Sequence, residues 1–206
     1  MAYFPFMIDI KNKKCLVVGG GTIAFHKVKI LSEYEVRIDV VSPKVCRELY
    51  ALAEDYDTIE IHQRGFQDND IEKKDFVVAA TDAQDLNNHI SKLCRQNNIL
   101  VNAVDMKEAC SFIFPALIKR EDLLISVSSG GKSPAAAAFV KKKVENNIPD
   151  FYEKMIDTLG EYRQYIMENT ESEKRKGIFN DLLQYGSEHN GEIPQEIVEE
   201  VLKKYE

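Results

Sequence analysis

Short apolar runs alternate with amphipathic stretches along the first half of the chain. Runs rich in β-branched residues are typical of buried strands, and apolar residues that recur every three to four positions are typical of helices. The predicted strands are 15–18, 36–41, 59–62, 76–80 and 100–104. The predicted helices are 22–34, 44–55 and 83–97, the last with Asp82 as its N-cap. Strands separated by helices predict right-handed crossovers, a parallel doubly wound sheet and an α/β fold of the Rossmann type.

The pattern changes at both ends of this region. Residues 3–10 are apolar enough to form an additional strand, and Pro5 is better tolerated at the edge of a sheet than at its centre. After Asp105, two β-rich runs at 111–118 and 123–128 are separated by four polar residues, which predicts a hairpin.

The rest of the chain is predicted to be helical. A polar loop at 128–134 leads into an alanine-rich helix at 135–146, and charged amphipathic helices are predicted at 150–168, 171–185 and 194–205. We therefore expect a nucleotide-binding Rossmann domain at 1–113, a dimerisation segment at 114–148 and a helical domain at 149–206.

Three glycines stand between the first predicted strand and the first predicted helix, in the run CLVVGGGTIA. The spacing Gly19-x-Gly21-x-x-Ala24 is the G-x-G-x-x-G/A fingerprint in its expected strand–helix context. Gly19 permits the tight turn, Gly21 lets the backbone approach a pyrophosphate, and Ala24 allows close packing of the helix on the strand. The free N–H groups at the helix N-terminus then favour phosphate binding. The motif predicts a dinucleotide site.

Ligands of a doubly wound sheet bind outside the carboxyl ends of its strands. Four segments are therefore expected to meet there: the glycine turn 19–23, Ser42-Pro43-Lys44, Thr81-Asp82, and Asn102 to Asp105. An NAD site usually carries an acidic residue at the end of its second strand, whereas here Asp39 lies within the strand. Adenosine recognition then relies on backbone groups and Ser42. Because Lys44 is compatible with NADP, the sequence does not decide between NAD and NADP. The alternative interpretation of Ser42 and Lys44 is a helix cap followed by a solvated charge.

Two further groups are candidates for substrate chemistry. Asp105 follows an apolar strand at the mouth of this crevice, where a partly desolvated carboxylate can accept a proton, although aspartate also caps turns. The loop SSGGKSP contains Ser128, Ser129, Gly130 and Lys132. It either forms a nest for carboxylates or phosphates or is a flexible exit from the hairpin.

Composition narrows the choice of protein class. The chain of 206 residues is 44% hydrophobic and 30% charged, and its formal net charge of −7 argues against a nucleic-acid partner. No apolar run approaches the roughly 20 residues of a membrane span, and the first residues lack the layout of a secretion signal. We therefore expect a cytoplasmic protein with no membrane partner. The four cysteines form no C-x-x-C pair and the four histidines show no ligand spacing, so no metal site is predicted.

Three segments together resemble one known family. VVGGGTIAFHKVKIL, VVAATDAQDLN and VNAVDMKEACSFIFPALIKREDLLISVSSGGKSP, in this order and spacing, are similar to the precorrin-2 dehydrogenase family of sirohaem biosynthesis. That family includes stand-alone dehydrogenases, a bifunctional dehydrogenase–ferrochelatase and the N-terminal module of sirohaem synthase. The resemblance covers about residues 1–150. It implies a homodimer built from an NAD-binding Rossmann domain, a dimerisation segment and a small helical domain.

The resemblance also implies a reaction and roles for particular residues. Precorrin-2, a polycarboxylate tetrapyrrole, is oxidised to sirohydrochlorin as a hydride passes to NAD and a proton is lost. Asp105 matches the family's essential aspartate, and Ser129 matches the serine of its substrate-side loop. The positions that match cofactor contacts are Thr22, Ile23, Pro43 and Lys44. Two alternatives stay open: an enzyme that also inserts Fe²⁺, with Asp105 accepting pyrrole protons, and an NAD(H)-sensing regulatory protein.

Overall fold

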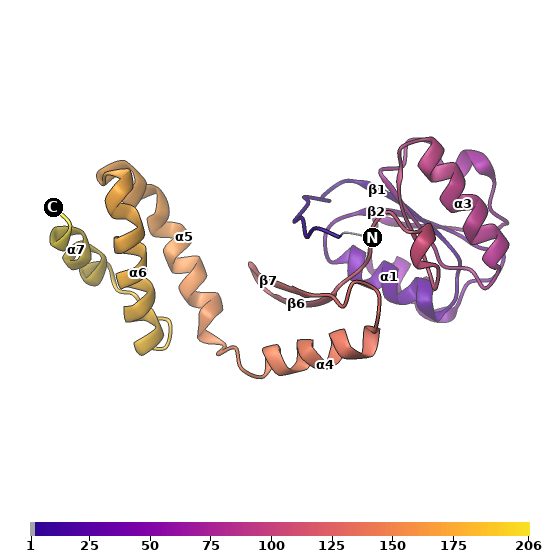
Figure 1. The fold of residues 1–206 in the computed structure, drawn as a ribbon. Helices are drawn as coiled ribbons and strands as arrows, with labels where there is room; N and C mark the ends of the chain where they lie inside the picture. The colour runs from indigo at the N-terminus through magenta and orange to yellow at the C-terminus, as the bar shows by residue number, and fades with distance from the viewer. Residues whose placement is uncertain (1–2) are drawn as a thin grey trace. The chain divides into compact units, whose positions relative to one another are not determined.

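The structure, a computed structural model, describes residues 3–206 and divides into two compact units (Figure 1). The first unit ends at Phe114 and the second spans Pro115–Glu206. Each unit has a hydrophobic core of its own. The further division predicted at residue 148 stays a prediction.

The first unit is built on a sheet of five parallel strands in the order β3-β2-β1-β4-β5. The strands are β1 (Lys14–Val18), β2 (Arg37–Val41), β3 (Ile59–His62), β4 (Phe76–Ala79) and β5 (Leu100–Ala103). The predicted α/β fold is confirmed. The chain proceeds outward from β1 to β2 and β3, then returns to the other side of β1 for β4 and β5. This reversal between β1 and β4 is the switch point at which such sheets bind ligands.

Helices cover both faces of this sheet because alternate strand residues point to opposite sides. The helices are α1 (Thr22–Ser32), α2 (Arg47–Asp55) and α3 (Gln84–Gln96), with short 3-10 helices η1 (Asp68–Ile71) and η2 (Lys107–Ala109). On one face, Val17 and Ile38 pack with Val28 of α1 and Leu49 of α2. On the other face, Leu16 and Val77 pack with apolar residues of α3.

The additional strand predicted at residues 3–10 is wrong. These residues form no strand, and β3 and β5 are the two edges of the five-stranded sheet. Phe4, Phe6 and Met7 are exposed, and the ring of Phe4 lies against that of Phe6. An apolar run pairs with a sheet only where it can hydrogen-bond to a neighbour and bury one face, and Pro5 has no N–H to donate.

The second unit begins with the predicted hairpin. Its strands β6 (Ala116–Arg120) and β7 (Leu123–Val127) pair antiparallel. The first strand starts later than the predicted residue 111. Four helices follow: α4 (Pro134–Glu145), α5 (Phe151–Asn169), α6 (Ser172–Glu188) and α7 (Gln195–Lys204). Buried Met155, Ile178 and Val198 join α5, α6 and α7 in one core. Within residues 3–206, no helix is both long and apolar enough to cross a membrane.

Candidate nucleotide-binding and catalytic site

The glycine turn leads directly from β1 into α1. Gly19 has φ +124°, a conformation that L side chains rarely adopt, and a Cβ atom there would lie 2.2 Å from the carbonyl oxygen of Ala80. Gly21 is the N-cap of α1, and a Cβ atom on it would meet no protein atom within 4 Å. Gly19 therefore serves the turn itself, whereas the space beside Gly21 is open to a ligand.

The first turn of α1 suits an anion. Its N-cap has no side chain to satisfy the exposed N–H groups, and no acidic residue lies in the first turn. Thr22 and Ile23 are exposed at this end of the helix. Backbone N–H groups and the positive end of the helix dipole both favour a pyrophosphate here. This chain's residues therefore fit a dinucleotide.

Gly20, which the spacing motif leaves unspecified, is packed as closely as Gly19. A Cβ atom there would lie 2.2 Å from the carbonyl oxygen of Lys44 and 2.9 Å from Oγ of Ser42. The carbonyl of Gly20 also accepts a 2.8 Å hydrogen bond from the backbone N–H of Cys46. The middle glycine thus lets the loop after β2 pack against the glycine turn, a contact that joins residues more than twenty positions apart.

The loop after β2 has one buried and two exposed candidate residues. Ser42 is buried, and its hydroxyl donates a 2.7 Å hydrogen bond to the carbonyl oxygen of Lys44. Pro43 and Lys44 are exposed beside it. The Ser42 hydroxyl therefore stabilises the loop, and the Lys44 carbonyl is the part of the loop that packs against Gly20.

The residues after β4 do not behave as predicted for a helix cap. Asp82 is exposed and the N-cap of α3 is Ala83, which makes no side-chain capping bond, so the predicted cap is wrong. Thr81 takes part instead: its hydroxyl donates to Oδ1 of Asn87 at 2.8 Å and accepts from the N–H of Ala83 at 3.2 Å. Buried Asn87 also donates to the carbonyl oxygen of Thr81 at 2.8 Å. Asn87 is a structural partner that the sequence pattern did not reveal.

Asn102 is in β5 and is only 8% exposed. Its Nδ2 donates a 3.0 Å hydrogen bond to the carbonyl oxygen of Phe112. This bond connects β5 to the segment that leads out of the first unit. A cofactor contact by Asn102 stays a prediction.

Asp105 is exposed just beyond the carboxyl end of β5. The expected partial desolvation of its carboxylate is therefore absent from this structure. The residue is the third of a turn closed by a 3.3 Å hydrogen bond from the N–H of Met106 to the carbonyl oxygen of Ala103. Its φ of +60° is left-handed, a conformation that aspartate and asparagine adopt more readily than other side chains.

Helix α3 hydrogen-bonds to the part of the loop that follows Asp105. Buried Ser91 donates a 2.5 Å hydrogen bond to the carbonyl oxygen of Ala109, and Arg95 donates to that of Glu108 at 2.7 Å. These contacts fix residues 108–109 against the helix. The exposed carboxylate is thus carried by a loop with several specific anchors.

The loop SSGGKSP belongs to the second unit. Ser129 is tied into the loop, because its hydroxyl donates to the carbonyl oxygen of Ser133 and accepts from the N–H of the same residue, both at 2.9 Å. Ser128 accepts a 3.1 Å hydrogen bond from the N–H of Gly130. Gly130 has a left-handed φ of +61°, and Lys132 is exposed. The loop is an ordered turn that precedes α4, whose N-cap is Ser133.

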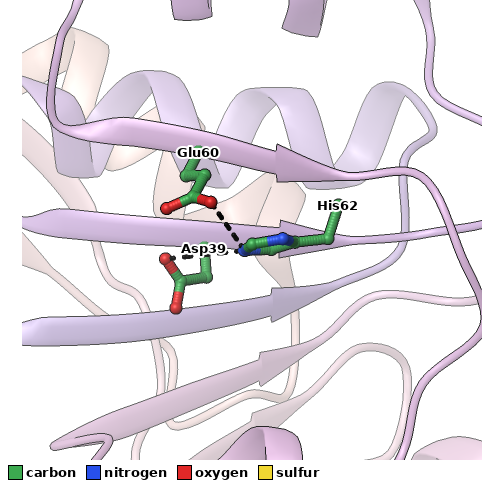
Figure 2. Close-up of side chains that lie close together, drawn as sticks. All are labelled: Asp39, Glu60 and His62. Atoms are coloured by element: carbon green, nitrogen blue, oxygen red, sulfur yellow. Dashed lines mark ion pairs between the residues drawn. The ribbon is translucent and has the colours of Figure 1, made fainter.

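Two carboxylates and a histidine lie close together on β2 and β3 (Figure 2). Asp39, Glu60 and His62 each offer an atom that could bind a metal ion, and these atoms lie within 4.8 Å of one another. The paired register of two parallel strands brings them to one face, which their sequence spacing did not reveal. Lys74, however, already forms an ion pair with Asp39. Because the ammonium group of Lys74 competes with a metal ion for this carboxylate, we interpret Asp39 as the ion-pair partner of Lys74 and not as a metal ligand.

Comparisons with known proteins identify similar sequences and a similar fold. A family model described as putative NAD(P)-binding matches residues 6–116. The siroheme synthase of Thioalkalivibrio sulfidiphilus is 40% identical over 185 residues, which are 89% of this chain and 38% of that protein. The siroheme synthase of Pseudoalteromonas atlantica is 32% identical over 204 residues, or 97% of this chain and 42% of that protein. The chain thus spans less than half the length of these relatives.

A solved structure supports the fold over almost the whole chain. "SirC, precorrin-2 dehydrogenase" matches with a TM-score of 0.73 and 24% identity, and the match covers 98% of both chains. The resemblance found in the sequence motifs is confirmed by these matches. The family model covers more than half of the 206 residues and includes the glycine turn and all five parallel strands. The chain therefore belongs to the putative NAD(P)-binding family.

Proposed function

We propose that this protein is an NAD-dependent precorrin-2 dehydrogenase, which converts precorrin-2 to sirohydrochlorin. One observation carries the proposal. An uncapped helix N-terminus with open space beside Gly21 and an exposed carboxylate, Asp105, both lie at the carboxyl edge of the same parallel sheet. A nucleotide site and a proton acceptor on one edge suit the removal of a hydride and a proton from one substrate.

The residues of the first unit have separate tasks in this reaction. The N–H groups at Thr22 and Ile23 bind the pyrophosphate, and Gly21 allows its close approach. NAD held at this site would supply the hydride acceptor. The carboxylate of Asp105 takes the proton that leaves the macrocycle, which general-base catalysis by a positioned carboxylate can do. The balanced change is precorrin-2 plus NAD⁺ to sirohydrochlorin plus NADH and a proton.

The substrate class is supported by the relatives and by local chemistry. The names of the similar proteins are siroheme synthase and precorrin-2 dehydrogenase. Precorrin-2 carries several carboxylates, so an acidic protein must supply local donors to bind it. We assign this role to Ser128, Ser129, Gly130 and Lys132, whose loop contains left-handed glycines typical of an anion-binding nest.

We also propose that the protein prefers NAD to NADP. We place it in the cytoplasm. We also propose that four further residues border or support the cofactor site: Ser42, Thr81, Asp82 and Asn102. The loop 42–46 after β2 contains no acidic side chain, so we assign Pro43 and Lys44 to the adenosine end of the cofactor. The four cysteines are free thiols, as is usual in a reducing compartment.

We further propose that the protein is a homodimer joined through its second unit. Helix α4 exposes Phe139 to 65% and Val140 to 45% of their full surface. Large apolar side chains that are adjacent and exposed on a helix favour contact with another protein surface. A second copy is the occupant implied by the family resemblance.

The test is a turnover assay with purified protein, NAD⁺ or NADP⁺, and precorrin-2. We expect NADH and the sirohydrochlorin spectrum to appear together, with NAD⁺ preferred. Parallel reactions with Fe²⁺ or Co²⁺ detect metal insertion by the same protein. Binding of NAD without any oxidation of precorrin-2 would overturn the proposal and favour a nucleotide-sensing role.

A further inference from the structure

One buried side chain, that of Cys110, contacts both ends of the turn that carries Asp105. Its sulfur lies 3.3 Å from the backbone nitrogen of Ala103 and 3.1 Å from the carbonyl oxygen of the same residue. It also lies 3.4 Å from the carbonyl oxygen of Met106. Ala103 and Met106 are the first and last residues of the turn in which Asp105 is third. The sulfur therefore contacts both ends of the turn.

The chemistry of Cys110 suits this position. The side chain is 6% exposed, and burial raises the pKa of its thiol, so the S–H is retained at neutral pH. A thiol donates weakly to carbonyl oxygens and its sulfur accepts weakly from an N–H. A thiolate would instead hold a negative charge against two carbonyl oxygens. The neutral form of Cys110 therefore matches the groups around it.

Asp105 needs support because its backbone is left-handed, with φ +60°. This conformation is unfavourable for a residue other than glycine and persists only where the surrounding structure holds it. Ser91 and Arg95 anchor residues 108–109, beyond the turn. Cys110 acts closer to Asp105, because it contacts the turn on both sides of that residue.

We propose that Cys110 is a positioning residue for the carboxylate of Asp105 and acts through the turn 103–106. The inference rests on the proposed function, which assigns proton transfer to Asp105. The thiol keeps the turn in one conformation, so that the exposed carboxylate stays at the carboxyl edge of the sheet. A misplacement of about 1 Å in a catalytic group is enough to cost a large part of the rate.

The first test compares the kinetics of three variants. Cys110→Ala removes the sulfur contacts, Cys110→Ser keeps a donor, and Cys94→Ala is the matched control. Cys94 is buried in the same core cluster, and its sulfur makes no hydrogen bond within residues 3–206. We expect kcat for precorrin-2 oxidation to fall about tenfold or more in Cys110→Ala, with little change in the KM for NAD. Cys110→Ser should recover most of kcat, and Cys94→Ala should retain it.

The second test measures the stability of the turn 103–106 directly and does not depend on enzymatic activity. Hydrogen–deuterium exchange at the Met106 N–H, which closes the turn, should be faster in Cys110→Ala and unchanged in Cys94→Ala. If the unaltered protein does not oxidise precorrin-2, the proposed function fails and the exchange comparison alone decides the inference. Equal exchange in the alanine variants, or equal losses of kcat in both, would overturn it.

Discussion

A side chain at residue 21 would enter space that the protein itself leaves empty, because a Cβ atom on Gly21 meets nothing within 4 Å. Gly21→Asp should therefore leave the melting temperature close to that of the parent. The same change should abolish NAD binding, since the carboxylate would occupy the pyrophosphate position with the wrong charge. Calorimetric titration with NAD and a thermal melt check both expectations. Unchanged NAD affinity would show that the cofactor binds elsewhere.

Gly20 should show the opposite pattern. A Cβ atom on Gly20 would lie 2.2 Å from the carbonyl oxygen of Lys44, a backbone atom that cannot move without the loop. We expect Gly20→Ala to destabilise the protein by about 1–3 kcal/mol through overpacking. Urea denaturation measures the loss, with Gly21→Ala as the control that should show little. Equal stability of the two variants would contradict this account of the glycine turn.

Asp105 combines a carboxylate with a left-handed backbone. A variant that tests the carboxylate must therefore keep the backbone conformation. Asp105→Asn keeps a side chain that tolerates this conformation and removes the proton acceptor. We expect precorrin-2 oxidation to fall by roughly 10²-fold or more, with NAD affinity and melting temperature nearly unchanged. If the residue only supports the turn, Asp105→Asn will keep its turnover, whereas Asp105→Ala will lose about 1 kcal/mol of stability.

The segment between β3 and β4 is stabilised by an ion pair that depends on pH. Asp70 of η1 accepts hydrogen bonds of 2.6 and 2.8 Å from the guanidinium of Arg64 and one of 2.8 Å from the N–H of Gln67. Arg64 holds the pKa of the Asp70 carboxyl below its usual range. The resulting stability is fully present above the ordinary carboxyl pKa of about 4 and is lost as pH falls through the lower folded value.

Asp70→Asn should accordingly lower the free energy of unfolding near neutral pH and have less effect in acid. The Asp70 side chain is 9% exposed and that of Arg64 is 40% exposed, so we expect a loss of about 1 kcal/mol. Urea denaturation at pH 7 and at about pH 3 measures it. Asp68→Asn, in the exposed pair with His89, is the control and should change stability little. A loss that is the same at both pH values would contradict the linkage.

Elements that follow from local patterns were predicted well, and contacts between distant elements were not. The five parallel strands and the helices between them follow from alternating apolar runs, and the sheet order and the similar solved structure confirm this fold. The strand expected at residues 3–10 failed because apolar character does not specify a pairing partner. The cap expected at Asp82 failed because the N-cap is Ala83, and Thr81 and Asn87 hydrogen-bond to each other beside the start of α3.

The candidate site divides in the same way. Gly19 and Gly21 were identified from spacing because their roles are local to the turn between β1 and α1. Gly20 and Cys110 were missed because each acts on residues that only the folded chain brings close, namely Lys44 and Ala103. A residue whose task depends on a distant partner carries no signal in a single sequence.

At the scale of the whole molecule, the proposed homodimer can be tested by a substitution on the exposed face of α4. Phe139→Glu puts a charge on a side chain that is 65% exposed in one chain. We expect this variant to shift from dimer to monomer in analytical ultracentrifugation at micromolar concentration, with an unchanged circular dichroism spectrum. Lys142→Glu, on the same helix but charged from the start, should remain dimeric. A parent protein that sediments as a monomer would refute the proposal.

The contact between Gly20 and the carbonyl oxygen of Lys44 also limits which changes to this loop the protein can tolerate. The loop after β2 is the natural place to alter nucleotide preference, since Pro43 and Lys44 border the adenosine end of the proposed site. An inserted or deleted residue there would move the Lys44 carbonyl and leave the middle glycine without its partner. Loop length and the glycine triplet should therefore be inherited together, and libraries for a new cofactor should vary side chains at 43 and 44 without changing that length.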